Sequence, residues 1–488
     1  MRVSFLKPPI GGILGLEMIT FVEPLGLECV GGALERDGHD CQIVDLRIDG
    51  LERGLAKAKA FAPDVIGLQC NFTTERYRSL RLLRRVREEF PGARVVVGGH
   101  DASRDPDWFR QEGIDAIVVG DGEDVMPGLI DAWQRDADAA AVPGLVLPRR
   151  GEDGGPLHTG PAPARGRLDD MPLPARHLIA DYADEYYINF RRPLALLETA
   201  RGCPFKCNFC SVWKFHESTF REKTPARVVE ELAAVAAPNV FVTDDIFWMN
   251  VKRGREMADA LIASGIKKHY TIQTRSDIIT KFPELVARWR ECGELSVFLG
   301  LEKIDDAGLA SVNKSNTAAN NERALEILAD LGVGYTPNFI VDPSWDRADF
   351  DKLKRWIDRT GAYNSGFSVL TPLPGTDLWD EVKKDVNTED WELFDITHAV
   401  LPTKLPLDEF YREVAGLWRH ALDVRYRIRG RLATHMKLVA ALASGKVTVS
   451  ALRKGMRMGA VLGRSETFLK AHKESPERLA EAAGLAAA

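Results

Sequence analysis

The chain has few cysteines and no long apolar run. It contains seven cysteines in 488 residues, which are too few and too irregularly spaced for a disulfide framework. The odd count is typical of a reducing compartment. No run of about 18 apolar residues occurs, and the N-terminus lacks the apolar core of a signal peptide. These absences predict a cytoplasmic protein that does not span a membrane.

Signatures of nucleotide and nucleic-acid binding are also missing. No G-x-G-x-x-G opens the first predicted helix, and no Walker sequence is present. The formal net charge of −6 gives no overall attraction to nucleic acid, so we expect no nucleic-acid partner. With 45% hydrophobic residues, the chain can form two or three domains with substantial cores.

The order of the predicted elements indicates an α/β chain with four regions. Residues 1–135 alternate β-branched runs with amphipathic helices, as in a Rossmann-like, doubly wound parallel sheet. Residues 136–190 are rich in Ala, Gly and Pro and are predicted to be a linker. Residues 191–400 repeat the alternation and predict a partial (β/α)6 barrel, whereas 401–488 are predicted to be helical. Strands are expected at 2–6, 41–45, 65–69, 94–98, 116–119, 194–199, 240–243, 270–274, 296–300, 334–341 and 367–371.

Three cysteines follow the first strand predicted in the barrel. Cys203, Cys207 and Cys210 lie in a loop long enough to wrap one cubane cluster. Three thiolates on a [4Fe–4S] cluster leave one iron without a protein ligand, and a cofactor can coordinate that iron. The alternative is a zinc or structural cluster site completed by His216 or Cys292. Zinc sites typically pair C-x-x-C elements, and no second pair is present, so the open-iron interpretation is favoured.

The spacing C-x-x-x-C-x-Φ-C, with Phe209 before the last cysteine, resembles the motif of the radical S-adenosylmethionine (SAM) superfamily. The resemblance covers roughly residues 190–400. It implies that SAM chelates the open iron, that the cluster cleaves SAM to a 5′-deoxyadenosyl radical, and that Phe209 contacts the adenine.

The same resemblance implies SAM contacts at the ends of later barrel strands. Asp244 and Asp245 would accept from the methionyl ammonium, Arg275 would contact the carboxylate, and Glu302 would contact the ribose. Each residue could instead be a surface carboxylate or part of a structural ion pair. The collection of barrel chemistry at C-terminal strand ends favours the SAM interpretation.

Loops rich in glycine follow the predicted strands of residues 1–135. The third strand is followed by Asn71 and Thr73, the fourth ends in or is followed by Gly98, Gly99 and His100, and the fifth is followed by Gly120, Gly122 and Glu123. Glycines let the backbone approach a large planar ligand at the carboxyl edge of a sheet. The joint order of these loops resembles the cobalamin-binding domain of B12-dependent radical SAM enzymes, which implies that these residues contact cobalamin. A domain that has lost its ligand is the alternative.

One histidine is similar to a cobalt ligand but stands in the wrong place. Asp37-x-His39 resembles the start of the D-x-H-x-x-G loop that supplies a cobalt ligand in other cobalamin enzymes. Here the sequence precedes the second predicted strand, and Gln42 stands where that loop has glycine. We therefore interpret His39 as a turn residue. The lower axial ligand of cobalt stays open, with the loop 70–73 as the best place to search.

A basic stretch near the C-terminus surrounds residues 425–431 and has apolar residues interleaved through 461. A solvated helical face explains it. The alternatives are peripheral contact with an anionic membrane and approach to an apolar substrate.

These resemblances imply a class B methyltransferase that uses a [4Fe–4S] cluster, SAM and methylcobalamin. Its expected partners are a small-molecule substrate, lipids included, and a reductant such as flavodoxin or ferredoxin. Residues 211–215 and 71–74 most resemble the hopanoid C-3 methylases, which implies an apolar or polycyclic substrate. One alternative is an anaerobic oxidative cyclase, or another radical rearrangement, acting on a tetrapyrrole or natural-product precursor. The other is a non-enzymatic iron–sulfur and corrinoid carrier, which would need no SAM residues.

Overall fold

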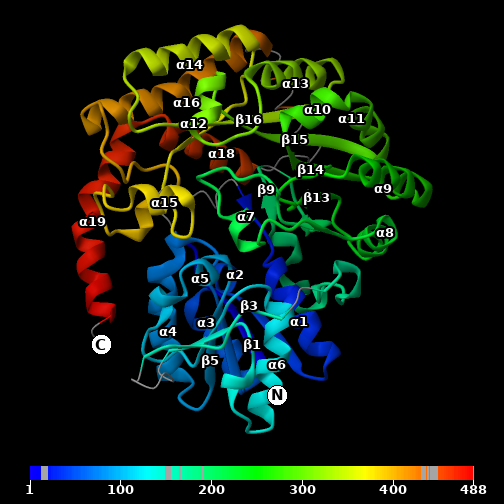
Figure 1. Cartoon of the computed structure of the whole chain (residues 1–488), viewed down its shortest axis with the longest axis vertical. Coiled ribbons are helices and arrows are strands. Elements are labelled where there is room, and N and C mark those ends of the chain that lie inside the picture. Colours follow the sequence, from blue (N-terminus) through cyan, green and yellow to red (C-terminus); the bar gives the residue numbers. More distant parts are fainter. Residues whose placement is uncertain are drawn as a thin grey trace.

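The structure is a computed structural model, and it describes residues 1–11, 20–148, 155–163, 166–189, 191–429, 436, 439 and 449–486. Two α/β bodies lie one above the other (Figure 1). The N-terminal body carries a seven-stranded sheet, and the second body carries a six-stranded sheet. The predicted α/β class is confirmed.

The N-terminal sheet has the strand order β3-β1-β4-β5-β6-β7-β8. Its parallel strands are β1 (Arg2–Lys7), β3 (Asp40–Asp45), β4 (Val65–Gln69), β5 (Arg94–Gly98) and β6 (Ala116–Val118). They are rich in Val and Ile because both faces of the sheet are covered. The strand order reverses at β1, which leaves a crevice at the carboxyl edge.

Helices cover both faces of this sheet, as in a doubly wound fold. One face packs against α1 (Leu25–Arg36) and α6 (Gly122–Gln134), which also contact each other. The other face packs against α3 (Leu51–Phe61), α4 (Arg76–Glu89) and α5 (His100–Arg104).

Part of the segment 136–190 belongs to the N-terminal sheet. Strands β7 (Leu145–Leu147) and β8 (Leu157–His158) extend the sheet antiparallel beyond β6. The three side chains of β7 are buried, and this apolar packing outweighs the Gly and Pro content from which we predicted a linker. The domain boundaries themselves stay a prediction.

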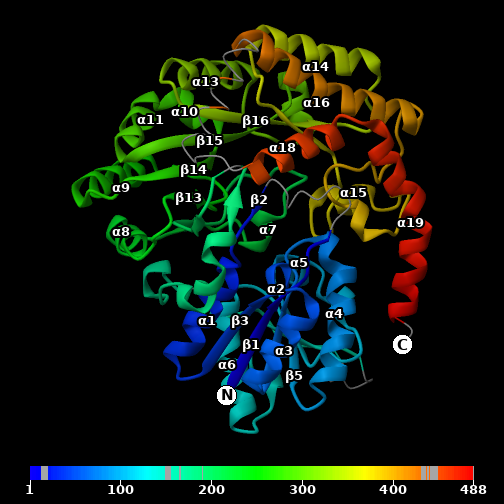
Figure 2. The same ribbon diagram turned by 180° about the vertical axis from the view of Figure 1, so that it is seen from behind.

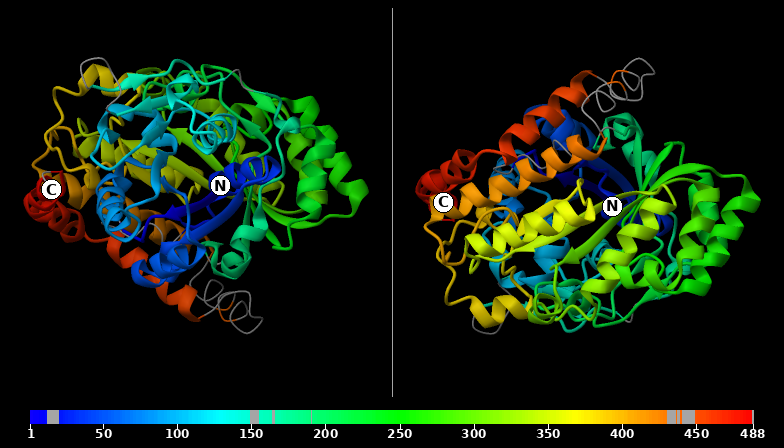
Figure 3. Two further views of the ribbon diagram at one scale, coloured as in Figure 1. Left: turned by 90° about the horizontal axis from the view of Figure 1, so that it is seen from below. Right: turned by 90° about the horizontal axis from the view of Figure 1, so that it is seen from above.

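The second sheet is wholly parallel, with the order β10-β13-β14-β15-β16-β17. These strands are β10 (Leu194–Leu197), β13 (Asn239–Val242), β14 (Lys268–Thr274), β15 (Gly293–Glu302), β16 (Gly334–Val341) and β17 (Gly366–Val369). Helices α8 (Pro225–Ala233), α9 (Val251–Ser264), α10 (Ser276–Lys281), α11 (Pro283–Trp289), α13 (Ala318–Asp330) and α14 (Arg347–Thr360) connect them. The helices lie along the outer side of the sheet (Figure 3). The open sheet of six strands confirms the predicted partial barrel.

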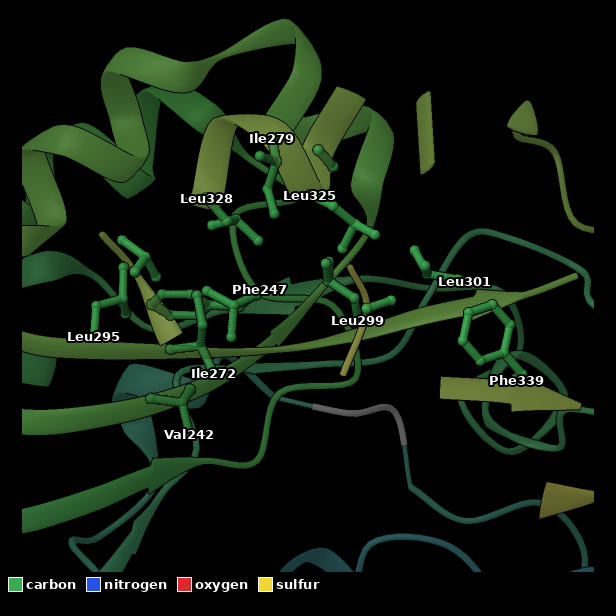
Figure 4. Close-up of a cluster of buried hydrophobic side chains, with 14 of the residues drawn as sticks. Val242, Phe247, Ile272, Ile279, Leu295, Leu299, Leu301, Leu325, Leu328 and Phe339 are labelled. Atoms are coloured by element: carbon green, nitrogen blue, oxygen red, sulfur yellow. The ribbon is translucent and has the colours of Figure 1, made fainter. Parts of the chain in front are cut away.

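The barrel core lies between the sheet and these helices. Leu325 and Leu328 of α13 pack above Leu295 and Leu299 of β15, and all four are buried (Figure 4). This packing fixes the strands, so the loops at their carboxyl ends have defined starting points.

The C-terminal region is helical, as predicted. Helix α16 (Leu407–Arg429) packs on α14, and α19 (Ser465–Ala486) contacts α16 and extends down to α4 of the N-terminal body (Figure 2). The side chains of the basic stretch 425–431 lie outside the described residues. Among the helices that are described, none has the length and apolarity needed to cross a bilayer.

Candidate functional site

A cavity of about 280 Å³ lies between the two bodies, at the carboxyl edge of the N-terminal sheet. The N-terminal body contributes apolar side chains, namely Phe5, Leu27, Val30, Val96, Val118 and Met126. The barrel contributes Glu198, Arg201, Phe215 and His216. Doubly wound folds bind ligands at this edge, so the cavity is the main candidate site.

Most residues predicted to contact cobalamin line this cavity. They are Asn71, Gly98, Gly99, His100, Gly120, Gly122 and Glu123. Thr73 lies outside the lining because its buried hydroxyl donates to Asp101 Oδ1 at 2.8 Å. The Thr73 side chain is directed to Asp101 of α5 and not to the cavity, so it stabilises the loop after β4.

Two features of the lining fit a large ligand that carries polar groups. Gly99 has φ +121°, and a Cβ there would lie 2.4 Å from the Cys70 carbonyl oxygen, so only glycine lets these loops approach each other. Gln69 Oε1 is buried and finds no hydrogen-bond partner within the described part of the chain. Buried acceptors are normally satisfied, so this one awaits a donor from a ligand. The amide groups of cobalamin would supply such a donor.

His100 connects the cavity to the barrel. Its Nε2 lies 2.8 Å from Ser211 Oγ, and its ring centroid lies 4.7 Å from that of Phe215. Burial, with smaller contributions from Arg104 and His216, lowers the pKa of His100 to about 3. The imidazole is therefore neutral at ordinary pH.

Of the two places considered for a cobalt ligand, His39 does not line the cavity, whereas the loop 70–73 lines it through Asn71. His39 contacts the N-terminal amine of Met1 and lies 3.6 Å from Asp131. The buried Cys70 thiol points to the Phe72 carbonyl oxygen at 3.6 Å.

The three cysteines of the motif follow the short strand β11 (Ala200–Arg201), which pairs with β12 (Arg221–Glu222). Burial raises the pKa of all three thiols, to about 12 for Cys210. As free thiols they therefore keep their protons, and the charge of bound iron is needed to form thiolates. This donor set fits an iron–sulfur cluster.

The zinc alternative requires His216 or Cys292 as a fourth ligand beside the three thiols. Nowhere in the described ranges do three His, Cys, Asp or Glu side chains converge as one metal ion requires. Thiolates on a cubane bind different irons and need no common point. Cys292 lies in the barrel core, with its thiol 3.6 Å from the Ala258 carbonyl oxygen.

The adjacent aspartates after β13 hold the chain that leads into the cysteine loop. Asp244 accepts from both the amide and the hydroxyl of Thr199, at 2.6 and 2.5 Å. Burial raises the pKa of Asp244 to about 7. The side chain of Asp245 is exposed, and its carboxylate accepts from the Gly202 amide at 3.1 Å. The protein around that carboxylate desolvates it and raises its pKa to about 6.

The other residues predicted to contact SAM also lie around the cysteine loop. The Arg275 guanidinium stacks 3.7 Å from the Phe205 ring centroid and donates to Asp277. Glu302 pairs with Lys314 at 2.8 Å. Phe209 is half-buried within the loop. The charged groups are thus engaged inside the protein, and their contacts with SAM stay predictions.

Sequence reasoning assigned no role to Glu198 and Arg201, which line the cavity. The Arg201 guanidinium contacts Glu123 Oε1 at 2.5 Å and Glu198 Oε2 at 2.7 Å. Their place between a buried strand and Cys203 was a usable signal, because a charged side chain buried there needs a partner. Gln69 was missed because it ends a predicted strand.

Comparison with known proteins gives matches in both bodies. A B12 binding domain model matches residues 13–130, and a radical SAM superfamily model matches residues 197–357. The chain is 34% identical over 419 residues to a hopanoid C-3 methylase of Methylococcus capsulatus, covering 85% of this chain and 79% of the relative. It is 28% identical to an anaerobic magnesium-protoporphyrin IX monomethyl ester cyclase of Rubrivivax gelatinosus, with coverage of 86% and 77%.

Two solved structures share the fold. TsrM of Kitasatospora setae, a radical SAM methyltransferase with cobalamin and a [4Fe–4S] cluster bound, has TM-score 0.61 and 20% identity, covering 78% of this chain and 74% of that one. OxsB, a cobalamin-dependent radical SAM enzyme, has TM-score 0.68 and 15% identity, with coverage of 98% and 81%. The two family models and the similarity to the hopanoid C-3 methylase show that the chain belongs to the cobalamin-dependent radical SAM enzymes, which use a [4Fe–4S] cluster, SAM and cobalamin.

Proposed function

We propose that this enzyme adds a methyl group to an unactivated carbon of an apolar, polycyclic substrate, with a hopanoid-type lipid as the best candidate. One observation carries the proposal: the loops predicted to contact cobalamin and the residues beside the cluster motif face the same cavity. When bound, SAM on the cluster would supply a 5′-deoxyadenosyl radical, and cobalamin would supply the methyl group. The similarity to a hopanoid C-3 methylase supports the substrate class.

The residue roles in this proposal follow the geometry around the cysteine loop. Cys203, Cys207 and Cys210 would hold the cluster. Asp245 is the best placed of the SAM candidates because its side chain is exposed and its carboxylate contacts Gly202, beside Cys203. Asp244 is buried, and each of its oxygens accepts from Thr199. Arg275 would have to exchange Asp277 for the SAM carboxylate.

The test is an anaerobic assay of reconstituted enzyme with hydroxocobalamin, a strong reductant, SAM carrying a CD₃ group, and a hopanoid. Each methylation should consume two SAM and two electrons, giving one S-adenosylhomocysteine, one 5′-deoxyadenosine and one methionine. Mass spectrometry should find CD₃ in place of one substrate hydrogen. If the enzyme forms 5′-deoxyadenosine but the hopanoid carries no CD₃, the proposed substrate class is wrong. If no 5′-deoxyadenosine forms, the protein is better explained as a non-enzymatic carrier of the cluster and cobalamin.

The second candidate is oxidative cyclisation of a tetrapyrrole, favoured by the similarity to anaerobic cyclases. The same assay with magnesium-protoporphyrin IX monomethyl ester separates the reactions. A cyclase would change the substrate mass without incorporating any CD₃.

We extend the proposal to the partners of the enzyme in a cytoplasmic setting. Flavodoxin or ferredoxin would supply the electrons, and the basic stretch 425–431 would give peripheral contact with anionic membrane. Cosedimentation with anionic vesicles, lost at high salt, tests the membrane contact. Support of turnover by reduced flavodoxin tests the electron donor.

A further inference from the structure

The cysteine loop is bracketed by two contacts that cross to the N-terminal body. Arg201 lies two residues before Cys203, and Ser211 directly follows Cys210. Arg201 contacts Glu123, and Ser211 contacts His100. Both partners line the cavity, so the loop is held at each end by a residue predicted to lie beside cobalamin.

The first contact is a buried ion pair. Arg201 and Glu123 have side-chain exposures of 10% and 9%, and Arg201 also contacts Asp121 at 3.4 Å and Glu198 at 2.7 Å. Removing one member of a buried pair leaves the other charge without its partner, so such a pair resists opening. The start of the cysteine loop is thereby tied to the first turn of α6.

The second contact is a neutral hydrogen bond supported by ring packing. His100 Nε2 lies 2.8 Å from Ser211 Oγ, while Phe215 packs against the imidazole. Because His100 stays neutral at ordinary pH, the bond keeps the same character over the working range of the enzyme. The end of the cysteine loop is thereby tied to the first residue of α5, the short helix after β5.

We infer that Glu123 and His100 are positioning residues for the iron–sulfur cluster, and that the cobalamin-binding body thus sets the separation between cluster and cobalt. This inference rests on the cofactor placement proposed above. The separation matters because hydrogen abstraction and methyl delivery must reach the same substrate carbon. A misplacement of about 1 Å can cost on the order of 100-fold in rate.

The cleanest test changes Ser211, because Glu123 and His100 would themselves face the corrin. Ser211→Ala removes the hydroxyl, Ser211→Thr retains it, and Arg81→Gln is a control that weakens a different contact between the bodies, at Glu481. In Ser211→Ala we expect the ratio of 5′-deoxyadenosine to methylated product to rise about five- to tenfold, the scale of one lost hydrogen bond. Ser211→Thr and Arg81→Gln should keep the wild-type ratio and the wild-type EPR signal of the reduced, SAM-bound cluster.

A second measurement on the full-length apoprotein needs no cofactor. Amide hydrogen exchange in residues 202–211 should speed up in Ser211→Ala and in Glu123→Gln, and not in Arg81→Gln. Two results would overturn the inference. One is amide exchange in residues 202–211 that stays at the wild-type rate in both Ser211→Ala and Glu123→Gln. The other is a wild-type ratio of 5′-deoxyadenosine to methylated product in Ser211→Ala. If the wild-type enzyme makes no 5′-deoxyadenosine, the proposed function fails, and the exchange result still decides the inference.

Discussion

The residues predicted to bind cobalamin and those predicted to bind SAM differ in whether they already have partners within the protein. On the cobalamin side, glycine loops surround a cavity, and Gln69 Oε1 has no partner in the described structure. On the barrel side, the charged residues predicted for SAM already have partners: Thr199 for Asp244, Asp277 for Arg275 and Lys314 for Glu302.

The difference follows from the kind of recognition that each half uses. A planar cofactor is received mainly by shape, so its loops keep glycines and an open surface. Charged groups in a buried loop cannot stay unpaired without a large desolvation cost, so they pair with each other until a ligand replaces the partner. If these residues bind the cofactors as predicted, the SAM half exchanges contacts on binding, whereas the cobalamin half already holds its cavity.

The largest effect is expected when one cluster cysteine of the barrel is removed and the cobalamin side is left intact. Cys203→Ala should abolish cluster iron and 5′-deoxyadenosine formation, because an iron loses its thiolate. Corrin binding, read from the visible spectrum, should persist. Cys292→Ala is the matched control: it removes a thiol from the barrel core, so it should lower thermal stability and retain the cluster. Loss of corrin binding in Cys203→Ala would show that the halves are not separable.

Breaking the cobalamin half should give the next largest effect. In Gly99→Ala the new Cβ would meet the Cys70 carbonyl at 2.4 Å, and φ is +121°. Backbone strain of about 1–3 kcal/mol and a displaced loop should follow. We expect at least about tenfold weaker corrin binding by spectral titration, with the cluster intact. Gly92→Ala places its Cβ where no atom lies within 4 Å and should bind corrin normally.

A pH titration sharpens the comparison on the barrel side. The pKa of Asp244, raised to about 7 by burial, means that the folded state holds a proton that the unfolded state releases near pH 4. This contribution to stability is therefore present near pH 4 and is lost as pH rises to about 7, by at most about 1.4 kcal/mol per pH unit. Thermal unfolding of wild type and Asp244→Asn from pH 5 to 8 should show a smaller decline in the variant. Parallel declines would mean that Asp244 ionises normally.

The smallest effect is expected where α19 meets α4. Arg81 and Glu481 form a partly exposed pair at 3.1 Å, and such pairs contribute about 0–1 kcal/mol. Arg81→Gln should change the melting temperature little and should leave both cofactors bound. Loss of corrin binding in Arg81→Gln would instead show that the contact between α19 and α4 is needed to hold the two bodies together.

The parallel strands of both sheets could be predicted from the sequence because strands that are buried on both faces consist mainly of Val, Ile and Leu. The sequence also predicted seven of the residues that line the cavity, among them Gly99, where any other residue would be strained. Strands β7 and β8 escaped prediction because they are short and stand among Gly and Pro. Arg201 and His100 could be seen in the sequence, but their partners Glu123 and Ser211 lie 78 and 111 residues away. Such pairs arise only when the two bodies dock.

We expect one cavity to bring the cobalt and the cluster together. EPR of the reconstituted protein tests it directly, since cob(II)alamin and the reduced cluster each carry an unpaired spin. Reducing the cluster should broaden or split the cob(II)alamin signal, and the triple Cys→Ala variant at 203, 207 and 210 should lose that change. A cob(II)alamin signal that stays the same while the cluster is reduced would contradict the account.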